Sequence, residues 1–173
     1  DDSKLAYLSN WLGEQGQTLA LQLVDIAGGG DEATTIGIGQ PLYFSWSPTS
    51  EKLITHTANQ HVALVTLASG DVQVLTEASA NFAAPQWSTT GEQLLFVTDE
   101  ENVPQLVLTD ANGENPQFIT NLSREDAVSF SLNSSGTRLA YIETSDLIGF
   151  NAFGPLFLYD LAKEEFTQLS DGP

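Results

Sequence analysis

Short runs of alternating apolar and polar residues fill this chain, and turn-forming residues separate them. A representative stretch contains the runs 42–46, 53–57, 62–67 and 72–76, which are rich in Val, Leu, Ile, Thr and aromatic side chains. Ser, Pro, Asn and Gly occupy the intervals between the runs. The runs are too short for helices, and a period of two places alternate side chains on opposite faces of a strand. The pattern therefore predicts an all-β chain of short antiparallel strands.

A local pattern recurs along the chain at intervals of roughly 40 to 50 residues. Its fullest copies span 44–54 and 85–96, where a Trp-Ser pair and a polar turn precede a strand that begins with Leu. A third copy, 130–141, has Leu132 where Trp is expected, and a further copy retains its tail at 5–7. A fixed period of this length is typical of repeat architectures, in which each unit buries its faces against its neighbours.

The repeat divides the chain into units at approximately 1–40, 41–80, 81–124 and 125–173. Each unit has four predicted strands, but the first begins at its second strand. Four-stranded antiparallel units packed radially form the blades of a β-propeller. We therefore expect one all-β domain, 1–173, of about four four-stranded blades, with the innermost strand of the first blade absent. Because propellers have 4–8 blades, the chain is expected to be part of a larger propeller.

The repeated residues resemble those of a known family. A Trp-Ser-Pro-x-Gly turn, a Leu-Ala-Tyr or Leu-x-Phe strand, an Asp-containing turn and a closing Leu-Thr together resemble the repeat of TolB-like β-propellers over essentially the whole chain. Pro48 is present in the second unit alone, and Gly91 and Gly136 in the third and fourth. The resemblance implies a non-catalytic protein–protein interaction scaffold in the periplasm or outside the cell. Similar blades occur in prolyl oligopeptidase-type serine peptidases, so the alternative is the substrate-gating propeller of such a peptidase.

The Trp residues of the repeat are predicted to have a structural role. Trp46 and Trp87 fall late on the innermost strands, where a large aromatic side chain packs between adjacent blades. The acidic segment 110–114 contains Asn112-Gly113 and lacks the spacing and distal Glu of an EF-hand loop. This segment is therefore predicted to be a tight turn.

The charge of the chain restricts its partners. The formal net charge is −18, from 23 acidic and 5 scattered basic residues. Nucleic acids and anionic membrane surfaces need clustered Lys and Arg, so neither is an expected partner. No apolar run approaches the roughly 20 residues of a membrane-spanning helix, so no membrane insertion is expected. The charge favours a basic protein partner.

The sequence offers no set of residues for catalysis or cofactor binding. It has no Cys and two His, His56 and His61, which flank one predicted hairpin turn and could approach each other. Two imidazoles are a weak metal signal, because a site usually needs three or more protein ligands. No Ser-His-Asp set and no phosphate-binding glycine loop is apparent, and the glycines at 28–30 are interpreted as a turn. We therefore expect no enzyme activity, no cofactor and no metal.

Two connections between second and third strands stand out because they are long and carry large apolar side chains, where loops are usually polar. They span 9–17 and 144–155. Long loops on a rigid scaffold commonly bind partners, and exposed aromatic side chains are typical interface anchors. The predicted partner-binding residues are Trp11, Leu12, Leu147, Phe150 and Phe153. In the alternative interpretation, these side chains fold back onto their own blades. The open ring further predicts self-association, or blades supplied by the rest of a longer parent chain.

Overall fold

The computed structural model describes residues 3–14, 16–30, 32–58, 60–79, 83–122, 127–144 and 154–171. All regular elements in these ranges are strands. They are β1 (Lys4–Gly13), β2 (Gly16–Asp25), β3 (Ala33–Gly39), β4 (Leu42–Trp46), β5 (Lys52–Thr57), β6 (His61–Thr66), β7 (Val72–Thr76), β8 (Gln86–Trp87), β9 (Gln93–Glu100), β10 (Val103–Asp110), β11 (Gln117–Asn121), β12 (Ala127–Leu132), β13 (Arg138–Thr144), β14 (Leu156–Asp160) and β15 (Glu165–Ser170). Among the described residues, no helix is long and apolar enough to span a membrane.

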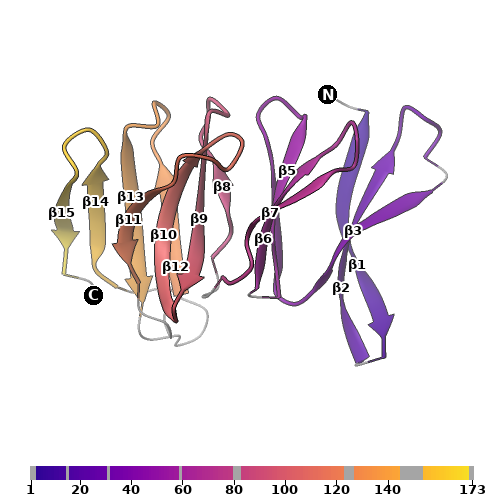
Figure 1. Ribbon diagram of the computed structural model, residues 1–173, viewed down its shortest axis with the longest axis horizontal. Coiled ribbons are helices and arrows are strands. Elements are labelled where there is room, and N and C mark those ends of the chain that lie inside the picture. Colours follow the sequence, from indigo (N-terminus) through magenta and orange to yellow (C-terminus); the bar gives the residue numbers. More distant parts are fainter. Residues whose placement is uncertain are drawn as a thin grey trace.

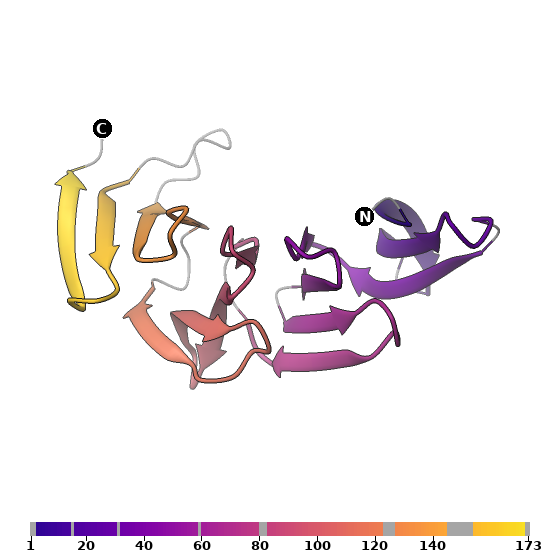
Figure 2. The ribbon, with the colours of Figure 1, turned by 90° about the horizontal axis from the view of Figure 1, so that it is seen from above.

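The strands form four antiparallel sheets in chain order. The first sheet has the order β1-β2-β3, the second β4-β5-β6-β7, the third β8 to β11 and the fourth β12 to β15. The four sheets follow one another along an open arc (Figures 1 and 2). This is a partial β-propeller, which confirms the predicted fold class and the missing innermost strand of the first blade.

Each sheet contains one register shift between its last two strands. These shifts fall at Leu21/Gln22, Val62/Ala63, Leu106/Val107 and Leu156/Phe157. A β-bulge bends a strand and increases its twist. The same irregularity at the same place in every sheet therefore gives each blade a similar shape.

A side-chain cap explains why the Trp-Ser-type turn recurs. In the third sheet, Ser88 N donates to Gln93 O at 2.9 Å, and Gln93 N donates to Ser88 Oγ at 3.0 Å. Ser47 and Asn133 accept equivalent bonds in the second and fourth sheets. One residue of each turn has positive φ: Ser50 (60°), Gly91 (76°) and Gly136 (65°). Polar short residues satisfy the turn's backbone N–H groups, and glycine adopts positive φ without steric cost.

Apolar side chains fill the space between adjacent sheets. Ile54, Val62 and Leu64 of the second sheet meet Leu94, Phe96 and Val107 of the third, and a larger cluster joins the third and fourth sheets. Trp87 packs against the first of these clusters and donates its Nε1–H to Ser45 O at 3.2 Å. Trp46 packs where the first and second sheets meet. Both Trp residues therefore pack between blades, as predicted.

One local prediction is wrong. Residues 9–13 and 16–17, predicted to lie in a loop, belong to the paired strands β1 and β2, with Trp11 opposite Thr18 and Leu12 opposite Gln17. Polar residues interrupt the apolar alternation in this hairpin because its end has solvent on both faces and needs no apolar side. In the third sheet, the innermost strand is β8, Gln86–Trp87.

Candidate functional site

Leu12, at the end of the β1–β2 hairpin, is the most exposed large apolar side chain in the described part of the chain. Figure 1 shows this hairpin extending beyond the ends of the other sheets. Leu12 is 83% exposed and Trp11 is 38% exposed, and as neighbours on β1 they point to opposite faces of the hairpin. Two large apolar side chains held on a paired strand, rather than a loose loop, lose little conformational freedom on binding.

A cavity of about 500 Å³ lies beside this hairpin. It opens between the hairpin end, the end of β3 and the turn that joins β5 to β6. Its lining residues are Trp11, Gly13, Glu14, Gly16, Gln17, Thr18, Ile38, Gly39, Gln40, Ala58 and Gln60. Trp11 and Ile38 supply apolar contact, whereas the Gln side chains and Glu14 supply donors and acceptors suited to a peptide backbone or a basic side chain.

Gly39 allows the walls of this cavity to approach each other. A Cβ at Gly39 would lie 2.8 Å from Thr57 Cγ2 and 2.9 Å from Ala58 Cβ. These distances are shorter than normal van der Waals contact, so a larger residue would push the end of β3 away from the β5–β6 turn. The glycine therefore sets the width of the cavity.

The predicted partner-binding residues remain a prediction. Trp11 and Leu12 lie side by side on β1 at the end of the hairpin, on opposite faces, whereas Leu147, Phe150 and Phe153 lie outside the described residues. Sequence reasoning missed Ile38, which shares the cavity with Trp11. No sequence signal distinguishes Ile38, because it belongs to an ordinary alternating strand and becomes a cavity residue only through the length of the neighbouring hairpin.

His56 and His61 do not form a pair. His56 lies opposite Val62 and His61 opposite Thr57, so the two imidazoles project from opposite faces of the β5–β6 ladder. His56 is buried and its Nδ1 lies 2.9 Å from Ala83 O, whereas His61 is exposed. Burial lowers the pKa of His56, and the bond to Ala83 opposes that shift in part. Within the described ranges, no cluster of three or more His, Asp or Glu could hold a metal ion.

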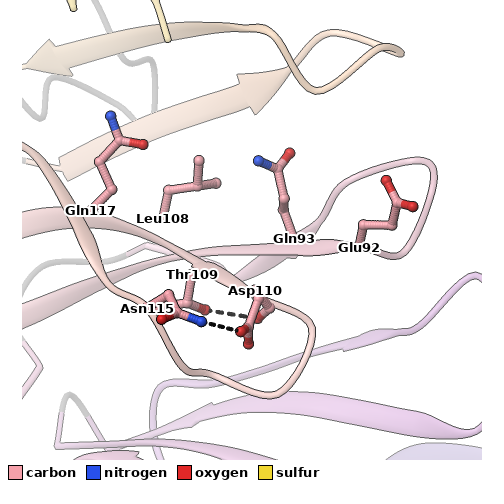
Figure 3. Close-up of a pocket in the computed structure, with 7 residues that line it drawn as sticks. All are labelled: Glu92, Gln93, Leu108, Thr109, Asp110, Asn115 and Gln117. Atoms are coloured by element: carbon pink, nitrogen blue, oxygen red, sulfur yellow. Dashed lines mark hydrogen bonds between the residues drawn. The ribbon is translucent and has the colours of Figure 1, made fainter. Parts of the chain in front are cut away.

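A second cavity, about 220 Å³, lies over the ends of β9, β10 and β11 and is lined by Asp110 (Figure 3). Asp110 Oδ1 accepts from Glu114 N and Asn112 N, both at 2.9 Å, and its Oδ2 accepts from Asn115 Nδ2 at 2.8 Å. These hydrogen bonds, that of Glu114 above all, lower the pKa of Asp110. The carboxylate is occupied by its own turn, which confirms the predicted tight turn at 110–114.

Comparison with solved structures identifies the fold of this chain. The chain shares the β-propeller fold of TolB proteins and of the propeller domains of prolyl oligopeptidase-like peptidases. No sequence family and no characterised protein matches the chain in sequence.

Three solved structures illustrate the likeness. TolB from Acinetobacter baumannii is similar at 20% identity and a TM-score of 0.64, over 97% of this chain and 41% of that chain. The β-propeller domain of the Trilobed protease from Pyrococcus furiosus is similar at 13% identity and a TM-score of 0.67, over 99% of this chain and 55% of that chain. Acylaminoacyl peptidase from Pyrococcus horikoshii is similar at 14% identity and a TM-score of 0.63, over 99% of this chain and 31% of that chain. The chain thus spans between about a third and about a half of these proteins, and the likeness at such identities concerns the fold.

Proposed function

We propose that this chain is a non-catalytic scaffold that binds a protein partner through the end of its β1–β2 hairpin. The observation that carries the proposal is the extension of the β1–β2 hairpin beyond the other sheets (Figure 1), because its end carries the exposed Leu12 and places Trp11 in a cavity with both apolar and amide walls. Aromatic anchors beside a concave surface are typical of the energetic centre of a protein interface. The fold shared with TolB supports a scaffold role.

The partner is proposed to be a basic protein or a basic peptide segment. The chain carries a net charge of −18, which attracts cationic surfaces and speeds their encounter. Glu14 lines the cavity and offers an acceptor for a Lys or Arg side chain next to the apolar contact of Trp11. As the resemblance to TolB-like repeats implies, the proposed location is the periplasm or the exterior of the cell.

Site-specific photo-crosslinking tests this proposal. A photoreactive residue at position 12 is expected to capture a partner from a periplasmic extract, and the double variant Trp11→Ser with Leu12→Ser is expected to lose capture in a pull-down. Val72 serves as the matched control, because it is also exposed (53%) but lies on the outer strand of the second sheet. Equal capture from positions 12 and 72, or a double variant that binds as well as the wild type, would exclude the hairpin as the binding site.

A gating propeller of a serine peptidase is the second candidate. The likeness to the acylaminoacyl peptidase from Pyrococcus horikoshii, over 99% of this chain, supports it. A hydrolase domain in the same polypeptide, labelled by a fluorophosphonate probe that reacts with active-site serines, would favour this candidate over the scaffold.

A further inference from the structure

Two buried polar atoms lie among the side chains that join the second sheet to the third. His56 is 1% exposed and Thr98 is 7% exposed. Neither Nε2 of His56 nor Oγ1 of Thr98 makes a hydrogen bond to another described residue. Burying a polar group without a partner destabilises a fold, so the great majority of such groups bond either to protein or to an ordered water molecule.

The strand register places both side chains on the faces that meet. His56 lies directly opposite Val62, and Val62 belongs to the apolar cluster between the two sheets. Thr98 follows Phe96 by two residues on β9, and Phe96 belongs to the same cluster. Directly opposite residues of paired strands share a face, and so do residues two apart on one strand. Both unpartnered atoms therefore face the same interface, one from each sheet.

A backbone carbonyl group determines which ring nitrogen of His56 carries the proton. Nδ1 lies 2.9 Å from Ala83 O, in the segment that links the second sheet to the third. Because a carbonyl oxygen can only accept a hydrogen bond, Nδ1 is protonated and donates. In the neutral ring Nε2 is then an acceptor that needs a donor. The Thr98 hydroxyl can both donate and accept a hydrogen bond.

The repeat itself does not require an imidazole at this position. His56 is the third residue after Leu53, and the third residue after Leu94 is Val97. Val97 belongs to the apolar cluster between the third and fourth sheets. An apolar side chain therefore satisfies blade packing at this position, and the buried imidazole is a feature of the contact between the second and third sheets.

We propose that one water molecule is bound between the second and third sheets, where it donates a hydrogen bond to His56 Nε2 and also bonds to Thr98 Oγ1. The two atoms do not bond to each other, and a bridging water joins polar groups that are not placed for a direct bond. Buried waters typically make about two to four hydrogen bonds to otherwise unpartnered groups. A metal ion fits less well, because a site usually has three or more protein ligands.

The proposed water would fix how the two sheets align. A shift of one sheet along the other would leave both polar groups buried without a partner, whereas a fully bonded polar network specifies one arrangement of a core. This site lies apart from the β1–β2 hairpin and does not depend on the proposed scaffold role.

Nuclear magnetic resonance of the imidazole nitrogens gives the first test. In nitrogen-labelled protein at about pH 8, well above the ordinary pKa of histidine, long-range proton–nitrogen correlation is expected to show a protonated Nδ1 and an unprotonated Nε2 for His56. The opposite tautomer would overturn the proposal, because Nε2 could not then accept a hydrogen bond from water.

Detection of the bound water gives the second test. Cross-relaxation between a long-lived water molecule and the His56 ring protons is expected in the wild type. Thr98→Val has nearly the same shape and is expected to lose this signal and to shift the Nε2 resonance, whereas Thr98→Ser keeps the hydroxyl and is expected to retain both. The matched control is Thr109→Val, because Thr109 is also buried (4% exposed) but its hydroxyl already donates to Asp110 O at 3.0 Å. No water signal in the wild type, or a signal that persists in Thr98→Val, would overturn the proposal.

Discussion

The first and third sheets share one repeat but have different surroundings. On β9 the consecutive residues Leu94 and Leu95 face opposite neighbours, and both are 0% exposed. On β1 the equivalent Leu5 is 49% exposed, whereas Ala6 packs against the second sheet. The contrast shows that a blade owes its core to the blades beside it. The same apolar position therefore contributes more to the stability of the fold between two blades than on the open face of the first sheet.

Truncation at the shared Leu position should give the largest difference between the two sheets. Leu94→Ala leaves a cavity among residues of the second and third sheets and is expected to lower the free energy of unfolding by about 2–5 kcal/mol. Leu5→Ala removes a half-exposed side chain and is expected to cost less than about 1 kcal/mol. Urea denaturation at low protein concentration measures both. Equal losses of unfolding free energy in the two variants would show that the Leu5 face of the first sheet is covered in solution.

A turn glycine offers a second, smaller contrast. A Cβ at Gly113, where φ is +77°, would clash with Leu75 Cδ2 of the second sheet, so Gly113→Ala is expected to cost about 2–4 kcal/mol. Gly30 also has positive φ, +70°, but the nearest atom to its Cβ position is Val24 Cγ1 at 3.8 Å. Gly30→Ala is therefore expected to cost about 1 kcal/mol, from backbone strain alone. Thermal unfolding of the two variants separates the cost of backbone strain from the cost of the clash with Leu75. Equal losses of stability in Gly113→Ala and Gly30→Ala would show that the clash with Leu75 adds nothing to the cost of strain.

Sequence periodicity predicts the inner strands of the complete sheets well because those strands have covered faces. The predicted runs 42–46 and 53–57 correspond to β4 and β5. In the turn between them, Ser47 accepts a backbone hydrogen bond and Ser50 adopts positive φ. The same reasoning fails at 9–17. Where both faces of a hairpin meet solvent, burial no longer selects apolar residues, so strand and loop have the same polar appearance.

The candidate site was only partly predictable for the same reason. Large apolar side chains in a polar segment marked Trp11 and Leu12. The cavity beside them depends on Gly39 and on the β5–β6 turn, which belong to other elements. A single sequence records no contact between such distant segments. It also gave no means of separating His56 from His61, because their opposite orientation follows from the strand register.

The smallest expected effect concerns His56, which is buried in the second sheet, whereas Leu8 at the equivalent position of the first sheet is half-exposed. Burial lowers the pKa of His56 below 6.5, so the unfolded chain binds a proton more readily than the folded protein. The stabilising effect of the neutral imidazole is complete above pH 6.5 and is lost as the pH falls from there through the folded-state pKa. Denaturation midpoints between pH 7.5 and 5.5 should therefore decline on acidification. His56→Val introduces the residue found at the equivalent position, Val97, and should flatten this decline in the denaturation midpoint. The control variant His61→Asn should preserve the decline. An unchanged decline in His56→Val would show that the buried imidazole does not cause it.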